Sequence, residues 1–302
     1  MVEQLTGDHR HTKVGQPSNP IYSMVSNRIS VCNKSEPMAS LAKKLALTLL
    51  PNSVLAELKK VHYARILRRM SESEEPDLIV LKHLVEPGQC VADVGANIGV
   101  YTKYLSDCVG PSGQVISIEP VPMTFDVLRS NIRKLGLKNV ALRNYAVSDT
   151  AGQVRMEVPK YEFGGENFYE ARVQSETAVD SPRSFVVPAT TLDALLSTIP
   201  VVHFIKCDVE GHELHCIRGA MKTIEKSRPA WLIELSGDLN DRASTGHQTL
   251  RILRNLGYGA FWVDGAKMRA WSAKVSSVNF FFLTNLHLEV LRERGFCVEG
   301  SC

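Results

Sequence analysis

Apolar and polar residues alternate with two different periods along this chain, and the period switches repeatedly after residue 75. Short apolar runs predict buried strands, and apolar residues three or four positions apart predict helices. This alternation is typical of an α/β fold whose mostly parallel sheet carries helices on both faces. The predicted strands are 90–94, 114–119, 140–144, 203–208, 230–235, 259–263 and 278–284, and the predicted helices are 98–107, 122–135, 212–226 and 243–256.

Between the third and fourth predicted strands the pattern changes. Two β runs, QVRMEVP and SFVVPA, flank a polar stretch and predict a hairpin with a long loop over residues 152–189. The loop at 160–183 contains Phe163, Phe168 and Tyr169. Long loops inside compact domains are often lids, so this one either closes over a ligand or is a surface excursion without a role. The TLDALLS stretch that follows predicts the start of a helix.

The chain that precedes the alternating strands and helices shows a different sequence pattern. Residues 1–38 are rich in Ser, Asn, Gly and Pro without a period and predict a disordered segment. Residues 39–75 have leucines at helical spacing, interrupted at Pro51, and predict a helical extension. The expected organisation therefore continues with a main domain at 76–290 and a C-terminal tail at 291–302.

The helical extension is strongly basic. Between residues 41 and 70, seven lysines and arginines accompany a single acid, Glu57. Two interpretations stay open: a basic amphipathic helix that contacts an anionic membrane surface, or a flap whose apolar face packs on the main domain. The whole chain has a net charge of only +3, which argues against a dedicated nucleic-acid binder.

The cysteines and the apolar runs bear on the compartment. Seven cysteines are scattered without a C-x-x-C pair, so we expect neither a disulfide framework nor a zinc site. Such usage suits a reducing compartment. No apolar run reaches the roughly 18 residues of a membrane span, and the N-terminus lacks the apolar stretch of a signal peptide. We therefore expect a cytoplasmic protein.

The first strand runs into the sequence DVGANIG. Gly95 lets the backbone turn sharply, and Gly99 opens the next helix, whose free N–H groups favour a carboxylate. Asn97 stands at the second glycine of the G-x-G-x-x-G fingerprint, where a pyrophosphate would press on the backbone. Asp93, just before the turn, suits an ammonium group. The loop therefore favours S-adenosylmethionine, which has an amino-acid tail and no phosphate.

Two further segments fit a nucleoside cofactor. Glu119 ends the second strand, where a carboxylate can accept hydrogen bonds from a ribose diol. The NYAVSD segment, 144–149, follows the third strand. It is either a turn capped by a polar side chain or a loop in which Ala146 and Val147 contact adenine.

The fourth strand ends in KCDVEGHE, at the edge where open α/β sheets bind ligands. Methyl transfer from a sulfonium requires alignment of the acceptor, and an alcohol must lose its proton to a base. His212, with an ordinary pKa near neutrality, and Asp208 are the candidates for that base, and Glu210 lies beside them. Alternatively, His212 is an exposed helix residue, and Glu210 and Glu213 are favourable first-turn charges.

Charged residues at this edge allow two more interpretations. Lys206 could snorkel at the strand edge, with its ammonium in water. We expect no metal, although Asp208, Glu210 and Glu234 could hold a magnesium ion that polarises the hydroxyl.

In this order and spacing, the motifs resemble the FkbM family of S-adenosylmethionine-dependent methyltransferases, over roughly residues 75–285. The resemblance implies a Rossmann-like class I methyltransferase fold with a mostly parallel, seven-stranded sheet. It implies methyl transfer to oxygen on a sugar, another small molecule or a natural product. Asp93, Gly95 and Gly99 match the family's cofactor loop, Glu119 its ribose-binding acid, and Asp208 and Glu210 its DVEG acids. The matching stretches are VADVGANIGVYT, ISIEPVPMTFDVLRSNI, NYAVSD, ATTLDALL, FIKCDVEGHELHCIRGA and RPAWLIEL.

Two competing functions stay open. One is a methyltransferase scaffold that binds a partner without turnover. The second is an NAD-dependent oxidoreductase, which needs a proton relay such as a Tyr-x-x-x-Lys pair, and no convincing pair is present.

Overall fold

The computed structural model describes residues 52–70, 76–158, 171–174, 184–235, 237–272 and 277–299. Apart from the first turn of helix α3, these residues belong to one compact unit that begins at Ala56. The predicted disordered segment 1–38, the first part of the helical extension and most of the loop at 160–183 lie outside the described residues.

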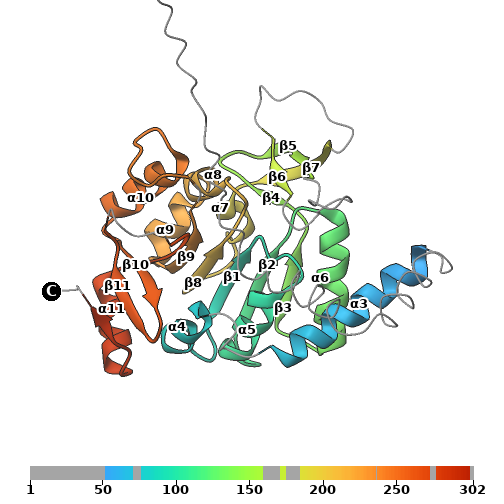
Figure 1. Cartoon of the computed structure of the whole chain (residues 1–302), viewed down its shortest axis with the longest axis horizontal. Coiled ribbons are helices and arrows are strands. Elements are labelled where there is room, and N and C mark those ends of the chain that lie inside the picture. Colours follow the sequence, from blue (N-terminus) through green and yellow to red (C-terminus); the bar gives the residue numbers. More distant parts are fainter. Residues whose placement is uncertain are drawn as a thin grey trace, which may run out of the picture. The chain divides into compact units, whose positions relative to one another are not determined.

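The core of this unit is a sheet of nine strands in the order β13-β11-β10-β12-β9-β8-β1-β2-β3 (Figure 1). The strands from β9 to β3 are parallel, and β12 lies antiparallel between β9 and β10. The strands are β1 (Cys90–Val94), β2 (Gln114–Ile118), β3 (Val140–Arg143), β8 (Phe204–Cys207), β9 (Ala230–Glu234), β10 (Gly259–Asp264), β11 (Lys267–Ala270), β12 (Asn279–Leu283) and β13 (Val298–Glu299).

All seven predicted strands are present, which confirms the mostly parallel α/β sheet. The predicted number of seven is two too low, because β11 and β13 extend the sheet beyond β10. These two strands have four and two residues and contribute few buried side chains. They therefore lack the apolar run by which a strand is recognised in sequence.

The helices differ from the prediction at three places, the first of which is α4 at residues 77–84, where no helix was expected. The single helix predicted over 212–226 is broken into α8 and α9 at Gly219, where a Cβ atom would lie 2.1 Å from the Ser148 carbonyl oxygen. Helix α11 was not predicted: it crosses residue 290, and its capping box uses His287 in place of the usual Glu or Gln. The helices are α3 (Asn52–Arg69), α4 (Asp77–Leu84), α5 (Val100–Val109), α6 (Pro122–Leu135), α7 (Leu192–Leu195), α8 (Glu213–Arg218), α9 (Met221–Ser227), α10 (Thr245–Asn255) and α11 (Asn285–Glu293).

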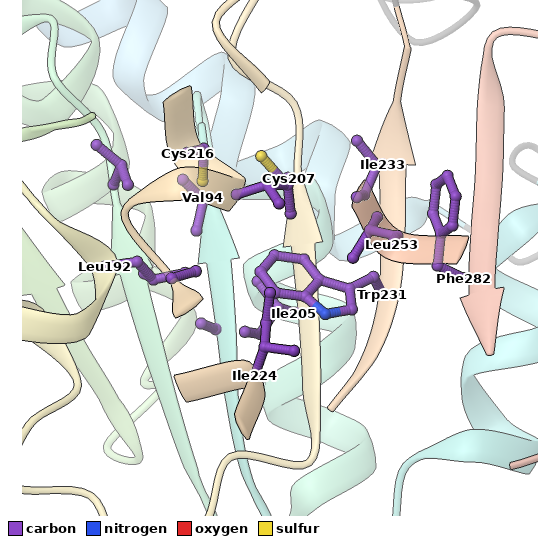
Figure 2. Close-up of a cluster of buried hydrophobic side chains, with 14 of the residues drawn as sticks. Val94, Leu192, Ile205, Cys207, Cys216, Ile224, Trp231, Ile233, Leu253 and Phe282 are labelled. Carbon is purple, nitrogen blue, oxygen red and sulfur yellow. The ribbon is translucent and has the colours of Figure 1, made fainter. Parts of the chain in front are cut away.

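The largest hydrophobic cluster lies between the sheet and the helices α7 to α10. In Figure 2 the indole of Trp231 lies close to Ile205 and Ile224, and all three side chains are fully buried. Burial of each such side chain stabilises the fold by about 1.5–3 kcal/mol. Helices α4 and α5 pack against each other, and α5 also contacts β1 and β2.

A second, smaller sheet interrupts the alternation between β3 and β8. Its strands β5 and β7 are antiparallel over six residue pairs, which confirms the predicted hairpin. The sheet buries its own hydrophobic cluster, which includes Met156 and Val187. The predicted helix start at 191–197 becomes the single turn α7, capped by Thr191. The sheet has the order β4-β7-β5-β6, with β4 (Ala146–Val147), β5 (Gly152–Glu157), β6 (Arg172–Val173) and β7 (Ser184–Thr190).

Helix α3 has two contrasting faces. Tyr63, Ala64 and Leu67 are buried, whereas Leu58 and Val61 are 52% and 53% exposed. The C-terminal half of α3 is tied to α6, because the Arg68 guanidinium donates a hydrogen bond to a carbonyl oxygen near the end of that helix. In the part of the chain that the structure describes, we find no helix with the length and apolar content needed to cross a membrane.

Candidate active site

The loop after β1 lies directly on the turn after β8. Gly95 has a φ of +78°, and a Cβ atom there would lie 1.7 Å from the Asp208 carbonyl oxygen. The N–H groups of Gly95 and Ala96 both donate to the Ile118 carbonyl at 2.9 Å, which joins the loop to the end of β2. Only glycine fits at this position. The loop therefore has no side chain at this point, where the carboxyl ends of β1, β2 and β8 lie close together.

The rest of the loop leads into α5. Asn97 has a φ of +52°, in the left-handed region that Asn tolerates better than most residues. Gly99 is the N-cap residue of α5, and its Cα packs so closely on α6 that a Cβ would lie 2.8 Å from the Leu128 side chain. The first N–H groups of α5 therefore begin at this loop.

Glu119 lies beside this loop at the end of β2. Its side chain is buried, and its two oxygens accept hydrogen bonds from the N–H groups of Asn97 and Val121, both at 2.9 Å. Burial raises the pKa of Glu119 to about 7, although the two backbone donors act against the increase. A carboxylate has about four lone-pair sites, so two remain for a diol.

Asp93 is the most buried acid of the group. One of its oxygens accepts a hydrogen bond from the Thr102 hydroxyl at 2.6 Å, and that hydroxyl also lies 2.8 Å from the Ser117 hydroxyl. The other oxygen, Oδ1, is buried without a hydrogen-bond partner among the described residues. Burial raises the pKa of Asp93. A buried oxygen without a partner is costly, and an ammonium ligand would satisfy it, so Asp93 fits the amino group of S-adenosylmethionine.

Lys206 and Asp208 form a buried ion pair at the end of β8. The ammonium nitrogen lies 2.8 Å from Asp208 Oδ2 and 4.6 Å from the centre of the Tyr101 ring. Lys206 is only 6% exposed. The interpretation that Lys206 snorkels into water is therefore wrong, because its ammonium binds a carboxylate and an aromatic face inside the protein.

The turn after Asp208 has an unusual backbone. Glu210 has a φ of +53°, which is rare for a residue with a side chain, and Gly211 has a φ of +95°. Glu213 holds this turn by accepting the N–H groups of Gly211 at 2.9 Å and Val209 at 3.3 Å. Burial raises the pKa of Glu213 to about 7. Glu213 is the first residue of α8, whereas Glu210 precedes the helix, so the first-turn interpretation is wrong for Glu210.

His212 is half-buried and bonded to another segment. Its Nε2 lies 3.0 Å from the Ser148 hydroxyl, and its ring stacks on His215 with the centroids 4.2 Å apart. Burial, assisted by the charge of His215, lowers the pKa of His212 to about 4. The ring is thus neutral at physiological pH, and the interpretation of His212 as an exposed helix residue is wrong.

The NYAVSD segment is anchored to Glu119. The Asn144 side chain donates hydrogen bonds to the Glu119 and Pro120 carbonyl oxygens at 2.8 and 3.0 Å. Ala146 and Val147 form β4, and their side chains are buried in two hydrophobic clusters. Contact of these two residues with adenine stays a prediction, and the segment is a short strand rather than only a capped turn.

Two further carboxyl groups lie on β9 and α4. Burial, followed by the charge of Asp208, raises the pKa of Glu234 to about 9. Asn279 pairs with Glu234 in the sheet and donates a hydrogen bond to Asp77 at 2.9 Å. Burial raises the pKa of Asp77 to about 6. Asp77 was not predicted from the sequence, because an acid at a helix start is usually explained by the helix dipole.

The possible magnesium ligands do not form a metal cluster. Asp208, Glu210 and Glu234 are the candidates for this role, but within the described ranges no group of three or more His, Cys, Asp or Glu side chains is arranged to hold a metal ion. The cation that this edge does contain is the ammonium of Lys206.

Comparison with known proteins identifies the family. The model of the methyltransferase FkbM domain matches residues 93–259, more than half of the chain. Hexuronic acid methyltransferase AglP of Haloferax volcanii is 27% identical over 154 residues, which cover 50% of this chain and 58% of that protein. A protein-L-isoaspartate O-methyltransferase of Aeropyrum pernix is 36% identical over 55 residues, 18% of this chain and 21% of that protein. The chain thus spans less than two thirds of these relatives.

Two solved structures are similar to this chain at low identity. The crystal structure of methyltransferase FkbM from Methylobacillus flagellatus KT is 13% identical, with 74% of this chain and 59% of that chain covered and a TM-score of 0.44. Aeropyrum pernix fibrillarin with bound S-adenosyl-L-methionine is 12% identical, with 69% and 73% covered and a TM-score of 0.42.

The matched region contains both motifs that form the edge described above, DVGANIG after β1 and CDVEGHE after β8. The order β3-β2-β1-β8-β9-β12-β10 with β12 reversed is that of a class I methyltransferase sheet. The chain therefore belongs to the FkbM family of S-adenosylmethionine-dependent methyltransferases.

Proposed function

We propose that this protein transfers the methyl group of S-adenosylmethionine to a hydroxyl oxygen of a small polar acceptor, most specifically a sugar or sugar acid. The observation that carries the proposal is the contact between the Gly95 backbone and the Asp208 carbonyl. This contact brings a carboxylate to the loop that would bind the cofactor. The name of the AglP relative, a hexuronic acid methyltransferase, supports the acceptor class.

Three residues would bind the cofactor. Asp93 Oδ1, buried without a partner among the described residues, would accept the amino group, and the free lone pairs of Glu119 would accept the ribose hydroxyls. Gly95 allows the ligand to approach the backbone. Bound S-adenosylmethionine supplies a methyl group already activated by its sulfonium.

The remaining task of the protein is to align the acceptor oxygen and remove its proton. Alignment can contribute up to roughly 7–11 kcal/mol, and a positioned base typically adds about 10²–10⁴-fold. We propose that Asp208 is the base that removes the proton from the acceptor hydroxyl. His212 is a weaker candidate because its Nε2 is already bonded to Ser148, whereas Asp208 adjoins the loop that carries Gly95. Glu210, in the strained turn that follows, would contact the acceptor.

A binding and transfer experiment tests this function. Calorimetry with S-adenosylhomocysteine, S-adenosylmethionine and NAD should show binding of the first two, and Glu119→Ala should abolish it. Transfer of labelled methyl groups should then be measured on uronic acids, neutral hexoses and an aliphatic alcohol. We expect transfer to a sugar, lost in Asp208→Asn while S-adenosylhomocysteine still binds.

Each other result has a definite meaning. Binding of NAD alone would refute the methyltransferase and favour an oxidoreductase. Binding of S-adenosylhomocysteine without transfer to any acceptor would favour a scaffold without turnover.

A further inference from the structure

The ammonium of Lys206 interacts with four acids: Asp93 on β1, Glu234 on β9, Asp77 on α4 and Asp208 in the turn after β8. Burial alone would lower the pKa of Lys206, but the charges of Asp208, Asp93 and Glu234 outweigh it and raise the pKa. The ammonium also acts on Asp77 at the start of α4, where its charge opposes the effect of burial on the carboxyl pKa. Lys206 therefore stays charged although only 6% of it is exposed.

The strand register explains how one ammonium reaches two functional carboxylates. Lys206 is paired with Asp93 across β1 and β8. Both side chains point to the face covered by α5, where Lys206 lies over Tyr101 and Asp93 is bonded to Thr102. Asp208 is two residues beyond Lys206 and so lies on the same face, with its carboxylate 2.8 Å from the ammonium.

Without the Lys206 ammonium, the negative charge of Asp93 and that of Asp208 would each disfavour ionisation of the other carboxyl group. Buried carboxylates in a medium of low dielectric bind protons more tightly, and a second negative charge nearby strengthens the effect. Asp208 already acts on its neighbours in this way, since its charge raises the pKa of both Asp93 and Glu234. A protonated Asp93 would no longer attract an ammonium group, and a protonated Asp208 would accept no proton.

We propose that Lys206 is the positioning residue of the active site: its ammonium keeps Asp93 and Asp208 ionised together, so that one can bind the cofactor's amino group while the other accepts the acceptor's proton. This inference rests on the proposed function. It gives Lys206 the electrostatic part that a divalent metal would have among the same acids, and it acts through Asp93 and Asp208 rather than on the methyl group.

The test compares Lys206→Met and Lys206→Arg with a control, Lys103→Met, which removes the α5 surface ion pair between Lys103 and Asp107. S-adenosylhomocysteine affinity is measured by calorimetry at pH 6.5, 7.5 and 8.5. We expect Lys206→Met to bind at least 10-fold more weakly than the wild type at pH 6.5 and to recover affinity as the pH rises, because a higher pH favours the ionised form of Asp93. Lys206→Arg and Lys103→Met should follow the wild type throughout.

A second variant keeps the test valid if Lys206→Met fails to fold. In Lys206→Met/Asp208→Asn the cation and one acid are removed together, so Asp93 loses its negative neighbour. This variant should bind S-adenosylhomocysteine within threefold of the wild type at pH 6.5, although it transfers no methyl group. A loss of affinity equal at every pH, or one that the double variant does not repair, would show a merely structural lysine and overturn the inference. Failure of the wild type to bind would instead refute the proposed function.

Discussion

Gly95 shows how one residue can determine both the fold and the site. The loop after β1 touches the Asp208 backbone at this glycine, and a methyl group has no room there. Gly136, which ends α6, has a similar positive φ of +74° but no atom within 4 Å of its Cβ position. The two glycines separate the effect of backbone conformation from the effect of close contact.

We therefore expect Gly95→Ala and Gly136→Ala to differ. Gly136→Ala should cost about 1–2 kcal/mol of unfolding free energy, the ordinary cost of a left-handed alanine. Gly95→Ala should cost more, because the loop must also move away from Asp208, and S-adenosylhomocysteine affinity should fall at least 10-fold. Denaturant unfolding and calorimetry measure the two effects. Equal unfolding free energies in the two variants would show that the contact at Gly95 relaxes without cost.

Glu119 should release a proton when the cofactor binds. Its pKa of about 7 means that it is partly protonated at pH 6.5, and ribose hydroxyls would favour the ionised form by donating hydrogen bonds to it. Calorimetry with S-adenosylhomocysteine at pH 6.5, in two buffers of different ionisation enthalpy, should reveal proton release by the wild type. Release should be absent in Glu119→Gln, and proton uptake by the wild type would contradict this assignment.

At the residue scale, site residues that belong to a local sequence motif can be predicted from the sequence. Interactions that depend on the pairing of different strands and helices cannot. Asp93, Gly95 and Glu119 are recognisable because each lies at the carboxyl end of a strand, at the edge where ligands bind. The charge environment of Lys206 and the hydrogen bond of Asp77 depend on neighbours from other strands and helices. The prediction for His212 rests on its ordinary pKa, which its burial changes.

At the scale of the elements, α3 has exposed apolar side chains that packing within the fold does not explain. Leu58 and Val61 are exposed on the helix that also carries Arg65, Arg68 and Arg69. Apolar side chains beside several cations suit an anionic lipid surface, where each cation contributes about 1 kcal/mol. This combination supports the membrane interpretation of the basic extension, while the buried face of α3 supports its packing on the domain.

Vesicle binding tests the exposed face of α3. The full chain should sediment with vesicles that contain phosphatidylserine and not with neutral phosphatidylcholine vesicles. Leu58→Asp and Val61→Asp together should reduce this binding at least fivefold. Val201→Asp is the control, because Val201 is similarly exposed, at 44%, far from α3 in the sequence. Equal binding by all variants would exclude α3 as the contact.

The elements themselves were predictable where they bury a continuous apolar face. The helix at 122–135 and the strand at 90–94 agree with the prediction at both ends. The break at Gly219 could not be foreseen, because it results from a contact with Ser148, more than seventy residues earlier. Tertiary contacts of this kind override a local helical pattern.

For the whole molecule, the raised carboxyl pKa values predict how stability changes with pH. Burial raises the pKa of Asp77 to about 6, of Glu119 and Glu213 to about 7, and of Glu234 to about 9. The folded chain then binds more protons than the unfolded chain, whose carboxyl groups titrate near 4. Stability should therefore fall as the pH rises toward 9, although His212 and His287, whose pKa values burial lowers to about 4, act in the opposite direction below about pH 6.5.

Calorimetric unfolding of the ligand-free protein should thus show a lower Tm at pH 9 than at pH 6. Glu234→Gln should flatten the upper part of this dependence, toward pH 9, because Glu234 has the highest pKa of these four acids. Lys82→Gln, an exposed change on α4, should leave the dependence unchanged. A Tm that rises over this range would mean that the acids are stabilised in their ionised form.

The smaller sheet has a consequence for how such proteins diversify. Its first and last strands in the sequence, β4 and β7, lie side by side, with Val147 paired to Thr190, so the chain enters and leaves the smaller sheet at the same place. The intervening stretch also has its own apolar interior. It can therefore be exchanged between homologues by recombination at two adjacent junctions without a change in the strands of the main sheet.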